Sequence, residues 1–174
     1  MPVRVAINGF GRTGRAMFRA ARDQGAEIEW AGINDVIDVT AVAQLLATDS
    51  VYGRFPGSVE ALDAAIRVDG VEIPVFSEPD PASLPWRDVD AEVVIESSGR
   101  FRARADAARH LDAGARKVVI SAPAKEPDVT VALGVNFDAA YDPDRHHISN
   151  ASCTTNCLAP LAKVLHEAFG IRTA

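Results

Sequence analysis

The chain has 174 residues, of which 48% are apolar, and a formal net charge of −6 at pH 7. This length and composition predict a folded domain and exclude the disordered class. The net negative charge argues against nucleic acid as a partner, because proteins that bind polyanions usually carry a clustered basic face. No apolar run is long enough to span a bilayer, and the start shows no signal-peptide pattern. We therefore expect a cytoplasmic protein with no membrane partner.

The first elements alternate between strand and helix. Apolar periodicity predicts a strand over residues 3–7, a glycine-rich turn over 8–14 and a helix that ends near Gly25. A second strand is expected over 28–33, and a helix follows over 38–47. The first strand, helix and second strand together have the size of a βαβ unit.

The remainder continues this alternation after a more irregular stretch over 48–85, where apolar segments on both sides of Asp69-Gly70 predict a hairpin. Further strands are expected over 92–96, 117–121, 130–133 and 146–149, and further helices over 103–113 and 152–169. Alternation of this kind predicts an α/β fold, namely a Rossmann-like doubly wound, mostly parallel sheet with helices on both faces.

The glycine-rich turn follows the first strand and opens the first helix, which is the context that a dinucleotide-binding motif requires. In Gly9-Phe10-Gly11-Arg12-Thr13-Gly14, Gly9 permits the tight turn, Gly11 lets backbone approach a pyrophosphate, and Gly14 lets helix and strand pack closely. The start of the helix offers unpaired N–H groups to the phosphates. Asp35, which closes the second strand, can bind a ribose hydroxyl and repel a 2′-phosphate. We therefore expect NAD as the cofactor rather than NADP.

Cys153 is the candidate nucleophile. Asn150 and Ser152 are both good helix caps, so Cys153 falls in the first turn of the helix predicted over 152–169. A helix N-terminus stabilises a thiolate, which is the reactive form of cysteine, and nearby N–H groups can stabilise an oxyanion. The hydroxyls of Ser152 and Thr154 beside the sulfur suit a phosphate or a carbonyl oxygen.

Other polar and sulfur-containing residues are given structural interpretations. Cys157 lies one turn deeper and is expected to be packed; with only two cysteines, neither a disulfide framework nor a zinc site is expected, and no metal is predicted. His166 is also interpreted as structural. His146 and His147 could be bases, but adjacent strand residues face opposite ways and no partner is evident. The arginines at 12, 15, 19 and 22 recur at helical spacing and predict a solvated helix face.

The sequence resembles the glyceraldehyde-3-phosphate dehydrogenase family over essentially its whole length. The motifs that carry the resemblance are Ile7 to Arg12, Asn34-Asp35, Asp49 to Phe55, Ser98 to Phe101, Ser121 to Lys125 and Ser149 to Cys157. The Cys153 segment is the most specific of these, and it is shared with erythrose-4-phosphate dehydrogenases.

The resemblance implies that Cys153 attacks the aldehyde of glyceraldehyde 3-phosphate, that hydride passes to NAD, and that inorganic phosphate cleaves the resulting thioester. It also implies a homotetramer for the full-length protein. The implied cofactor residues are Asn8, Gly9, Phe10, Gly11, Arg12, Thr13, Gly14, Asn34, Asp35, Pro79, Ser98, Gly99 and Ser121, and Ser152 and Thr154 border the attacking phosphate. We expect an NAD-binding domain over 1–151 and the start of a catalytic domain over 152–174.

Three positions depart from the family pattern, in which Ile is common at Thr13, Arg at Pro79 and Thr at Ser98. Pro79 loses a charge contact but keeps a carbonyl that could meet adenine. The family's catalytic histidine and the residues that hold the substrate phosphate have no counterpart within these 174 residues, so residues 1–174 alone are expected to bind NAD without turnover. An erythrose-4-phosphate dehydrogenase and a non-catalytic NAD-binding module remain as alternatives.

Overall fold

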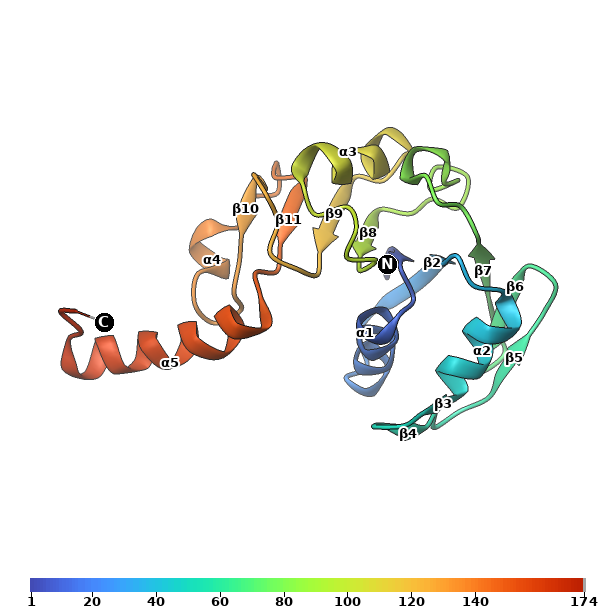
Figure 1. Ribbon diagram of the computed structural model, residues 1–174, viewed down its shortest axis with the longest axis horizontal. Helices are drawn as coiled ribbons and strands as arrows, with labels where there is room; N and C mark the ends of the chain where they lie inside the picture. Colours follow the sequence, from blue (N-terminus) through green and yellow to red (C-terminus); the bar gives the residue numbers. More distant parts are fainter. Residues whose placement is uncertain (174) are drawn as a thin grey trace.

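A computed structural model describes residues 1–173 as a central sheet flanked by helices, with one helix extending to the side (Figure 1). The strands of the main sheet are β1 (Val3–Asn8), β2 (Ile28–Asn34), β5 (Val59–Ala61), β6 (Ala65–Val68), β7 (Val71–Phe76), β8 (Val93–Glu96), β9 (Lys117–Ile120), β10 (Val129–Thr130) and β11 (His147–Ser149). A separate hairpin consists of β3 (Thr48–Asp49) and β4 (Gly53–Arg54). The helices are α1 (Arg12–Asp23), α2 (Val39–Ala47), the 3-10 helix η1 (Pro81–Ser83), α3 (Arg104–Asp112), α4 (Phe137–Ala140) and α5 (Cys153–Phe169).

The main sheet is doubly wound. Its strands lie in the order β10-β11-β9-β8-β1-β2-β7-β6-β5. Every neighbouring pair from β10 to β7 is parallel, whereas β6 pairs antiparallel with both β7 and β5. The chain leaves β1 for β2 on one side and later returns to β8 on the other side. The order therefore reverses next to β1, which is where open α/β sheets bind their ligands.

Both faces of the sheet are buried, as continuous apolar strands predict. On one face, Val5 and Ile7 of β1 pack with Phe18 of α1 and Leu46 of α2. On the other face, the intervening Ala6 belongs to a second apolar cluster that includes Trp86. Figure 1 shows α1 and α3 on opposite sides of the strands. The prediction of a Rossmann-like α/β fold is confirmed.

The predicted elements match the structure well in the regular regions and less well in the irregular ones. The first helix already includes the third glycine, because α1 begins at Arg12. The strand expected over 130–133 is wrong, since β10 contains only Val129 and Thr130. The short elements β3, β4, β5, η1 and α4 were not predicted. Each is too brief to produce a recognisable periodicity.

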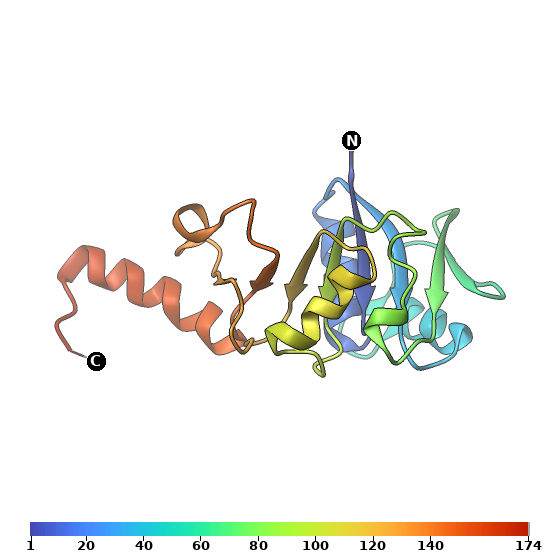
Figure 2. The same ribbon diagram turned by 90° about the horizontal axis from the view of Figure 1, so that it is seen from above.

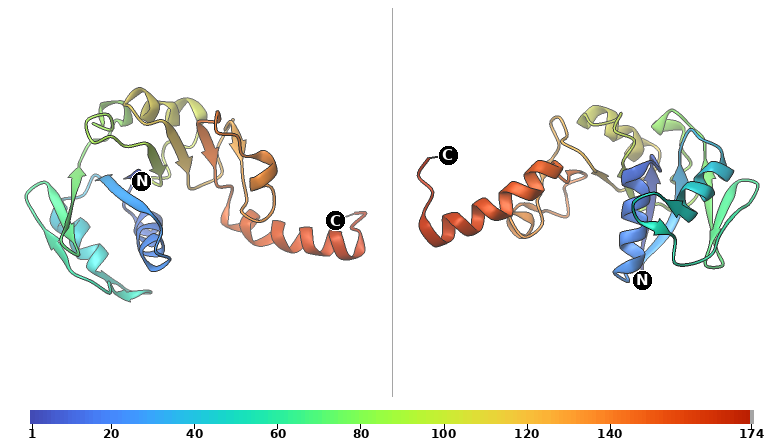
Figure 3. Two further views of the ribbon diagram at one scale, coloured as in Figure 1. Left: turned by 180° about the vertical axis from the view of Figure 1, so that it is seen from behind. Right: turned by 60° about the horizontal axis from the view of Figure 1, so that its bottom comes forward.

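The last helix extends away from the sheet, and the views in Figures 2 and 3 agree with Figure 1 on this. None of the residues from Cys153 to Phe169 is buried. The segment predicted to begin a second domain, 152–174, consists of this helix and its extension, and its last residue, Ala174, lies outside the described residues. Within residues 1–173, no helix has the length and apolarity needed to cross a membrane.

Candidate functional site

A cleft lies at the carboxyl ends of β1, β2 and β8, where the strand order reverses. Asn8 ends β1, Asn34 ends β2, and Ser97 and Ser98 follow the last residue of β8. Parallel strands bring these ends to one edge of the sheet, so residues that are distant in sequence meet there. The cleft is lined by Asn8, Gly9, Gly11, Asn34, Asp35, Val36, Glu78, Pro79, Ser97, Ser98, Arg100 and Phe101.

The glycine-rich turn fits tightly against the loop after β8. Gly9 has a φ of +91°, and a Cβ built on it would lie 2.4 Å from the backbone nitrogen of Ser98. A Cβ on Gly14 would lie 2.4 Å from the carbonyl oxygen of Gly9. The hydroxyl of Ser97 donates a hydrogen bond of 2.6 Å to that same carbonyl. The turn and the β8 loop therefore form one close-packed unit that tolerates only glycine at positions 9 and 14.

The start of α1 suits the pyrophosphate of a dinucleotide. Gly11 is the N-cap residue and provides no side-chain acceptor for the N–H groups of the first turn, which also contains no acidic residue. A Cβ built on Gly11 would have no atom within 4 Å, and Gly11 lines the cleft. Free N–H groups, the positive end of the helix dipole and open space thus coincide at this point.

Two side chains at the end of β2 shape the opposite wall. Asp35 accepts a hydrogen bond of 2.6 Å from the backbone N–H of Phe10, which ties β2 to the glycine-rich turn. Asn34 binds the backbone of Glu78 in both directions: its Nδ2 donates to the Glu78 carbonyl, and its Oδ1 accepts from the Glu78 N–H, each at 2.9 Å. The segment of Glu78 and Pro79 is therefore held against the cleft.

The structure gathers about half of the predicted cofactor residues in the cleft itself. Those that line it are Asn8, Gly9, Gly11, Asn34, Asp35, Pro79 and Ser98. Phe10 and Gly14 are buried beside it. Arg12 and Thr13 are exposed in the first turn of α1, while Gly99 is exposed in the β8 loop and Ser121 is half-buried after β9. These four residues are not among those that line the cleft.

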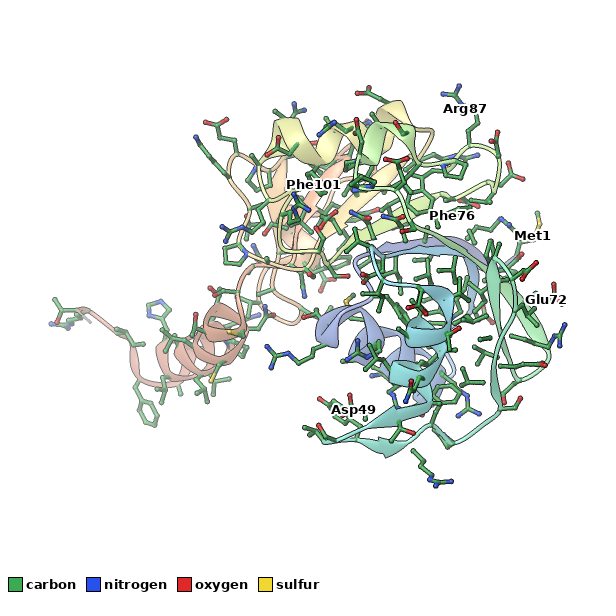
Figure 4. All side chains as sticks on the ribbon, turned by 45° about the vertical axis from the view of Figure 1, so that its right-hand side comes forward. Met1, Asp49, Glu72, Phe76, Arg87 and Phe101 are labelled. Carbon is green, nitrogen blue, oxygen red and sulfur yellow. The ribbon has the colours of Figure 1, made fainter. Side chains whose placement is uncertain are left out.

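Sequence reasoning missed several residues at this edge. Glu78, Arg100 and Phe101 line the cleft, and Glu96 lies buried beneath it with 1% exposure. Figure 4 shows Phe101 on the same side of the molecule as α3 and away from Asp49, which belongs to the β3–β4 hairpin. A signal for Glu96 was present, because it is a charged residue that directly ends the apolar strand Val93-Val94-Ile95. A charged side chain is rarely fully buried unless it has hydrogen-bonding or charged partners.

Cys153 is the first residue of α5 and is exposed. Ser152 is the N-cap, and its Oγ accepts from the N–H of Thr155 at 2.9 Å. Three hydroxyls gather around this cap, since the Ser152 Oγ lies 2.9 Å from the Thr154 Oγ1 and 2.7 Å from the Thr155 Oγ1. The predicted N-cap and first-turn position are confirmed, but these residues lie on α5 and are not part of the cleft lining.

Three structural interpretations are wrong. Cys157 is exposed rather than packed, because nothing within residues 1–173 covers this side of α5. Arg19 is buried at 8% exposure rather than solvated. His147 does have a partner, since its Nδ1 lies 3.2 Å from the Asp128 Oδ2. His166 has the structural role that was expected, because its Nδ1 accepts from the N–H of Ile171 beyond the helix end.

No group of three or more His, Cys, Asp or Glu side chains that could hold a metal ion occurs among the described residues. The cleft combines a glycine-rich turn, an open helix start and an acid at the end of the second strand. This combination at the switch point of a doubly wound sheet defines a dinucleotide-binding α/β domain.

Comparisons with known proteins identify the family. Residues 3–104 match the family described as "Glyceraldehyde 3-phosphate dehydrogenase, NAD binding domain", and residues 152–174 match its "C-terminal domain" counterpart. The chain is 58% identical over 174 residues to "Glyceraldehyde-3-phosphate dehydrogenase 1" of Streptomyces avermitilis, covering 99% of this chain and 52% of that protein. It is 55% identical to the Geobacillus stearothermophilus enzyme of that name, covering 98% and 51%, and 53% identical to that of Thermotoga maritima, covering 97% and 50%.

The chain belongs to the glyceraldehyde-3-phosphate dehydrogenase family, and its cofactor is NAD. It spans about half the length of the curated relatives that it matches. The glycine-rich turn and the cleft both lie within or next to the segment that matches the NAD-binding domain.

Proposed function

We propose that the full-length protein oxidises glyceraldehyde 3-phosphate with NAD and inorganic phosphate to 1,3-bisphosphoglycerate, through a thioester on Cys153, as a step of glycolysis. The observation that carries this proposal is the exposed Cys153 in the first turn of α5, in a chain whose family members are named for this substrate. The N–H groups of that turn favour a thiolate and an oxyanion at the attacked carbonyl.

The chemistry assigned to this chain is nucleophilic. The Cys153 thiolate forms a bond to the aldehyde carbon, whose oxygen takes the negative charge and then a proton, giving a hemithioacetal. When bound, NAD would accept the hydride from the carbon of this adduct, and the hydroxyl proton would leave to water, which together give a thioester. A phosphate oxygen then attacks the thioester carbon and releases the Cys153 thiolate, so the sulfur ends as it began. The proposal places Ser152 and Thr154 at the border of that phosphate; their hydroxyls share one hydrogen bond, and the hydroxyl that accepts in this pair keeps its own hydrogen to donate to the phosphate.

The cofactor contacts are proposed for the same residues that the sequence predicted. Backbone groups from Gly9 to Gly14 hold the pyrophosphate at the start of α1. Asp35 accepts from an adenosine ribose hydroxyl, and the carbonyl of Pro79 faces the adenine. The remaining proposed cofactor residues are Asn8, Asn34, Ser98, Gly99 and Ser121. The proposal also assigns residues 1–151 to the NAD-binding domain and 152–174 to the start of the catalytic domain.

The decisive test compares two single-sulfur variants of the full-length protein. Cys153→Ser removes the proposed nucleophile, and Cys157→Ser removes another exposed thiol one turn along the same helix. We expect Cys153→Ser to lose at least about a thousandfold in NADH formation from glyceraldehyde 3-phosphate and phosphate, as removal of a covalent nucleophile does, while Cys157→Ser retains most activity. Both variants should bind NAD normally. Equal activity in Cys153→Ser and the parent protein would overturn the proposal.

The same assay separates the other candidate functions. Faster oxidation of erythrose 4-phosphate, with no requirement for inorganic phosphate, would identify an erythrose-4-phosphate dehydrogenase. NAD binding with no oxidation of either aldehyde would identify a binding module. Residues 1–174 expressed alone are expected to bind NAD and to form no NADH at steady state. Size-exclusion chromatography with light scattering tests the proposed homotetramer, and fractionation of cells tests the proposed cytoplasmic location.

A further inference from the structure

A carboxylate with no contact to bulk water lies directly beneath the cofactor cleft. Glu96, the last residue of β8, is 1% exposed and does not itself line the cleft. Its Oε1 accepts from both the N–H of Ser98, at 2.8 Å, and the Ser98 hydroxyl. Its Oε2 accepts from Asn8 Nδ2 at 2.5 Å and lies 3.0 Å from His110 Nε2. Four hydrogen-bonding groups therefore converge on one side chain.

Trp86, on the side of His110 away from Glu96, determines which ring nitrogen of His110 carries the hydrogen. The indole N–H of Trp86, which can only donate, lies 2.9 Å from His110 Nδ1. The Nδ1 atom is therefore the acceptor, so the hydrogen of the neutral ring is on Nε2 and points at Glu96. Asn8 Nδ2 and His110 Nε2 are 3.4 Å apart, and both donate to the same oxygen rather than to each other. Trp86 and His110 are both fully buried, so water cannot replace either partner.

The network continues from Glu96 to the opposite wall of the cleft. Because Asn8 Nδ2 donates to Glu96, its Oδ1 is free to accept from Asn34 Nδ2, at 2.7 Å. Asn34 in turn holds the backbone of Glu78 through both its N–H and its carbonyl group. The orientation of each amide follows from the one before it. These hydrogen bonds thus connect Glu96 directly to Ser98 on one wall of the cleft. Through Asn8 and Asn34 they also connect it to Glu78 on the other wall.

We propose that Glu96 is a positioning residue for NAD, and that His110, held by Trp86, keeps its carboxylate in place. This inference rests on the NAD binding that the family membership establishes, and it assigns a role to three residues that do not line the cleft. His110 also meets the cleft wall directly, because its ring and that of Phe101 lie nearly perpendicular with centroids 6.4 Å apart. The network connects β1, β2, α3 and the loops after β7 and β8 at a single point.

The proposal requires an acceptor-only group at position 96. Glu96→Gln keeps the shape but places an amide NH2 among Ser98, Asn8 and His110, so at least one donor faces a donor. The amide of Asn8 or the Ser98 loop must then turn, and the cleft loses its arrangement. We expect the Kd for NAD to rise by about tenfold or more, because a buried polar group left without a partner is costly.

Variants of His110 test the direction of the hydrogen bond independently of Glu96. His110→Gln keeps a donor that reaches toward Glu96, whereas His110→Leu offers none. We expect His110→Leu to raise the Kd for NAD by about tenfold and His110→Gln to restore most of the affinity. Trp86→Phe removes the indole N–H together with the volume of one buried ring, and it lets the His110 hydrogen move to Nδ1. We expect it to show a lower melting temperature and an intermediate rise in the Kd. Glu92→Gln, which changes a half-exposed carboxyl just before the same strand, is the matched control and should leave the Kd unchanged.

The measurement is NAD titration of the full-length protein by calorimetry, with the melting temperature of each variant recorded so that all are titrated while folded. A structural role alone would lower the melting temperature and leave the Kd of the folded protein unchanged. If Glu96→Gln and His110→Leu bind NAD within twofold of the parent protein, the positioning role is wrong. If Glu96→Gln does not fold, equal Kd values for His110→Leu and His110→Gln overturn the proposal, and a difference between them supports it. Failure of the parent protein itself to bind NAD would instead contradict the cofactor assignment.

Discussion

The carboxylate of Asp35 accepts a hydrogen bond of 2.6 Å from the backbone N–H of Phe10, so the acid at the end of β2 also closes the turn after β1. The sequence predicted only a ribose contact for this residue. In the structure Asp35 Oδ2 is engaged with the turn, while Oδ1 lies 3.4 Å from the N–H of Ile37, too far for a strong hydrogen bond. One oxygen therefore shapes the glycine-rich turn, and the other is available to a ligand.

This division of roles leads to a prediction for Asp35→Asn. The Asn oxygen can still accept from the Phe10 N–H, so the fold and its melting temperature should change little. The remaining position becomes a donor without charge, which weakens the ribose contact and removes the repulsion of a 2′-phosphate. We expect affinity for NAD to fall by about 1.5–3 kcal/mol, the worth of a hydrogen bond to a charged group. Affinity for NADP should fall less or rise.

Titrations with NAD and NADP, performed side by side on Asp35→Asn and the parent protein, check this prediction. Asp38→Asn is the control, because that carboxylate caps α2 by accepting from the N–H of Ala41 and has no part in the cleft lining. An unchanged ratio between the two cofactor affinities in Asp35→Asn would show that the acid does not select against the 2′-phosphate.

Gly9 and Gly11 should respond to alanine in opposite ways. At Gly9 the backbone has a φ of +91° and a new Cβ would meet the Ser98 backbone at 2.4 Å. Gly9→Ala is therefore expected to destabilise the protein by about 3 kcal/mol or more. At Gly11 the φ is −70° and nothing lies within 4 Å. Gly11→Ala should keep the stability of the parent protein but lose NAD affinity, because its methyl group occupies the space beside the helix start.

Chemical unfolding and NAD titration of the two variants separate these effects. A stable Gly11→Ala that binds NAD as tightly as the parent protein would mean that the pyrophosphate does not approach this glycine.

The regular part of the fold could be predicted because its cause is local. The alternation of Val3, Val5 and Ile7 and the glycine pattern after them depend on neighbouring residues only. Burial of charged groups depends on contacts that are distant in sequence. Glu96 meets Asn8 and His110 only after the sheet has formed, and His147 finds Asp128 through a strand pairing at the far edge. Helical spacing likewise could not show that the β3–β4 hairpin folds over Arg19.

Arg19 joins α1 to this hairpin from a buried position, and its loss should be costly. Its Nη2 donates to the carbonyls of Leu46, at 2.6 Å, and Gly53, at 3.2 Å, and the guanidinium lies 5.4 Å from the centre of the Phe55 ring. Arg19→Met keeps most of the apolar stem but leaves both carbonyls without this donor. We expect the free energy of unfolding to drop by about 2 kcal/mol or more.

Urea unfolding of Arg19→Met can be compared with Arg12→Met, which changes an exposed arginine on the same helix and is expected to alter stability by less than about 0.5 kcal/mol. Equal stability of the two variants would show that Arg19 contributes no more to stability than a solvated arginine, as the helical spacing first indicated.

Asp128 should make the protein sensitive to acid. Burial by itself raises the pKa of this carboxyl, but hydrogen bonds from Arg104 and from the backbone N–H groups of His147 and His146 outweigh it and hold the pKa well below its ordinary value. The Arg104 Nε donates to Oδ1 at 2.7 Å, and both backbone N–H groups donate to Oδ2 at 3.0 Å. These bonds stabilise the ionised form in the folded state, and they hold the segment before β10 against the start of β11.

The lowered pKa of Asp128 determines how the stability of the protein changes with pH. The contribution to stability is fully present above the unfolded-state pKa of about 4 and is lost as pH falls from there toward the lower folded-state pKa. Asp128→Asn should be less stable than the parent protein at pH 7, and the difference should shrink between about pH 4 and pH 2 as the parent protein loses this contribution. Unfolding measured across this range, with Asp112→Asn on α3 as a control, provides the comparison. A difference between Asp128→Asn and the parent protein that stays constant with pH would show that the charge of Asp128 does not stabilise the fold.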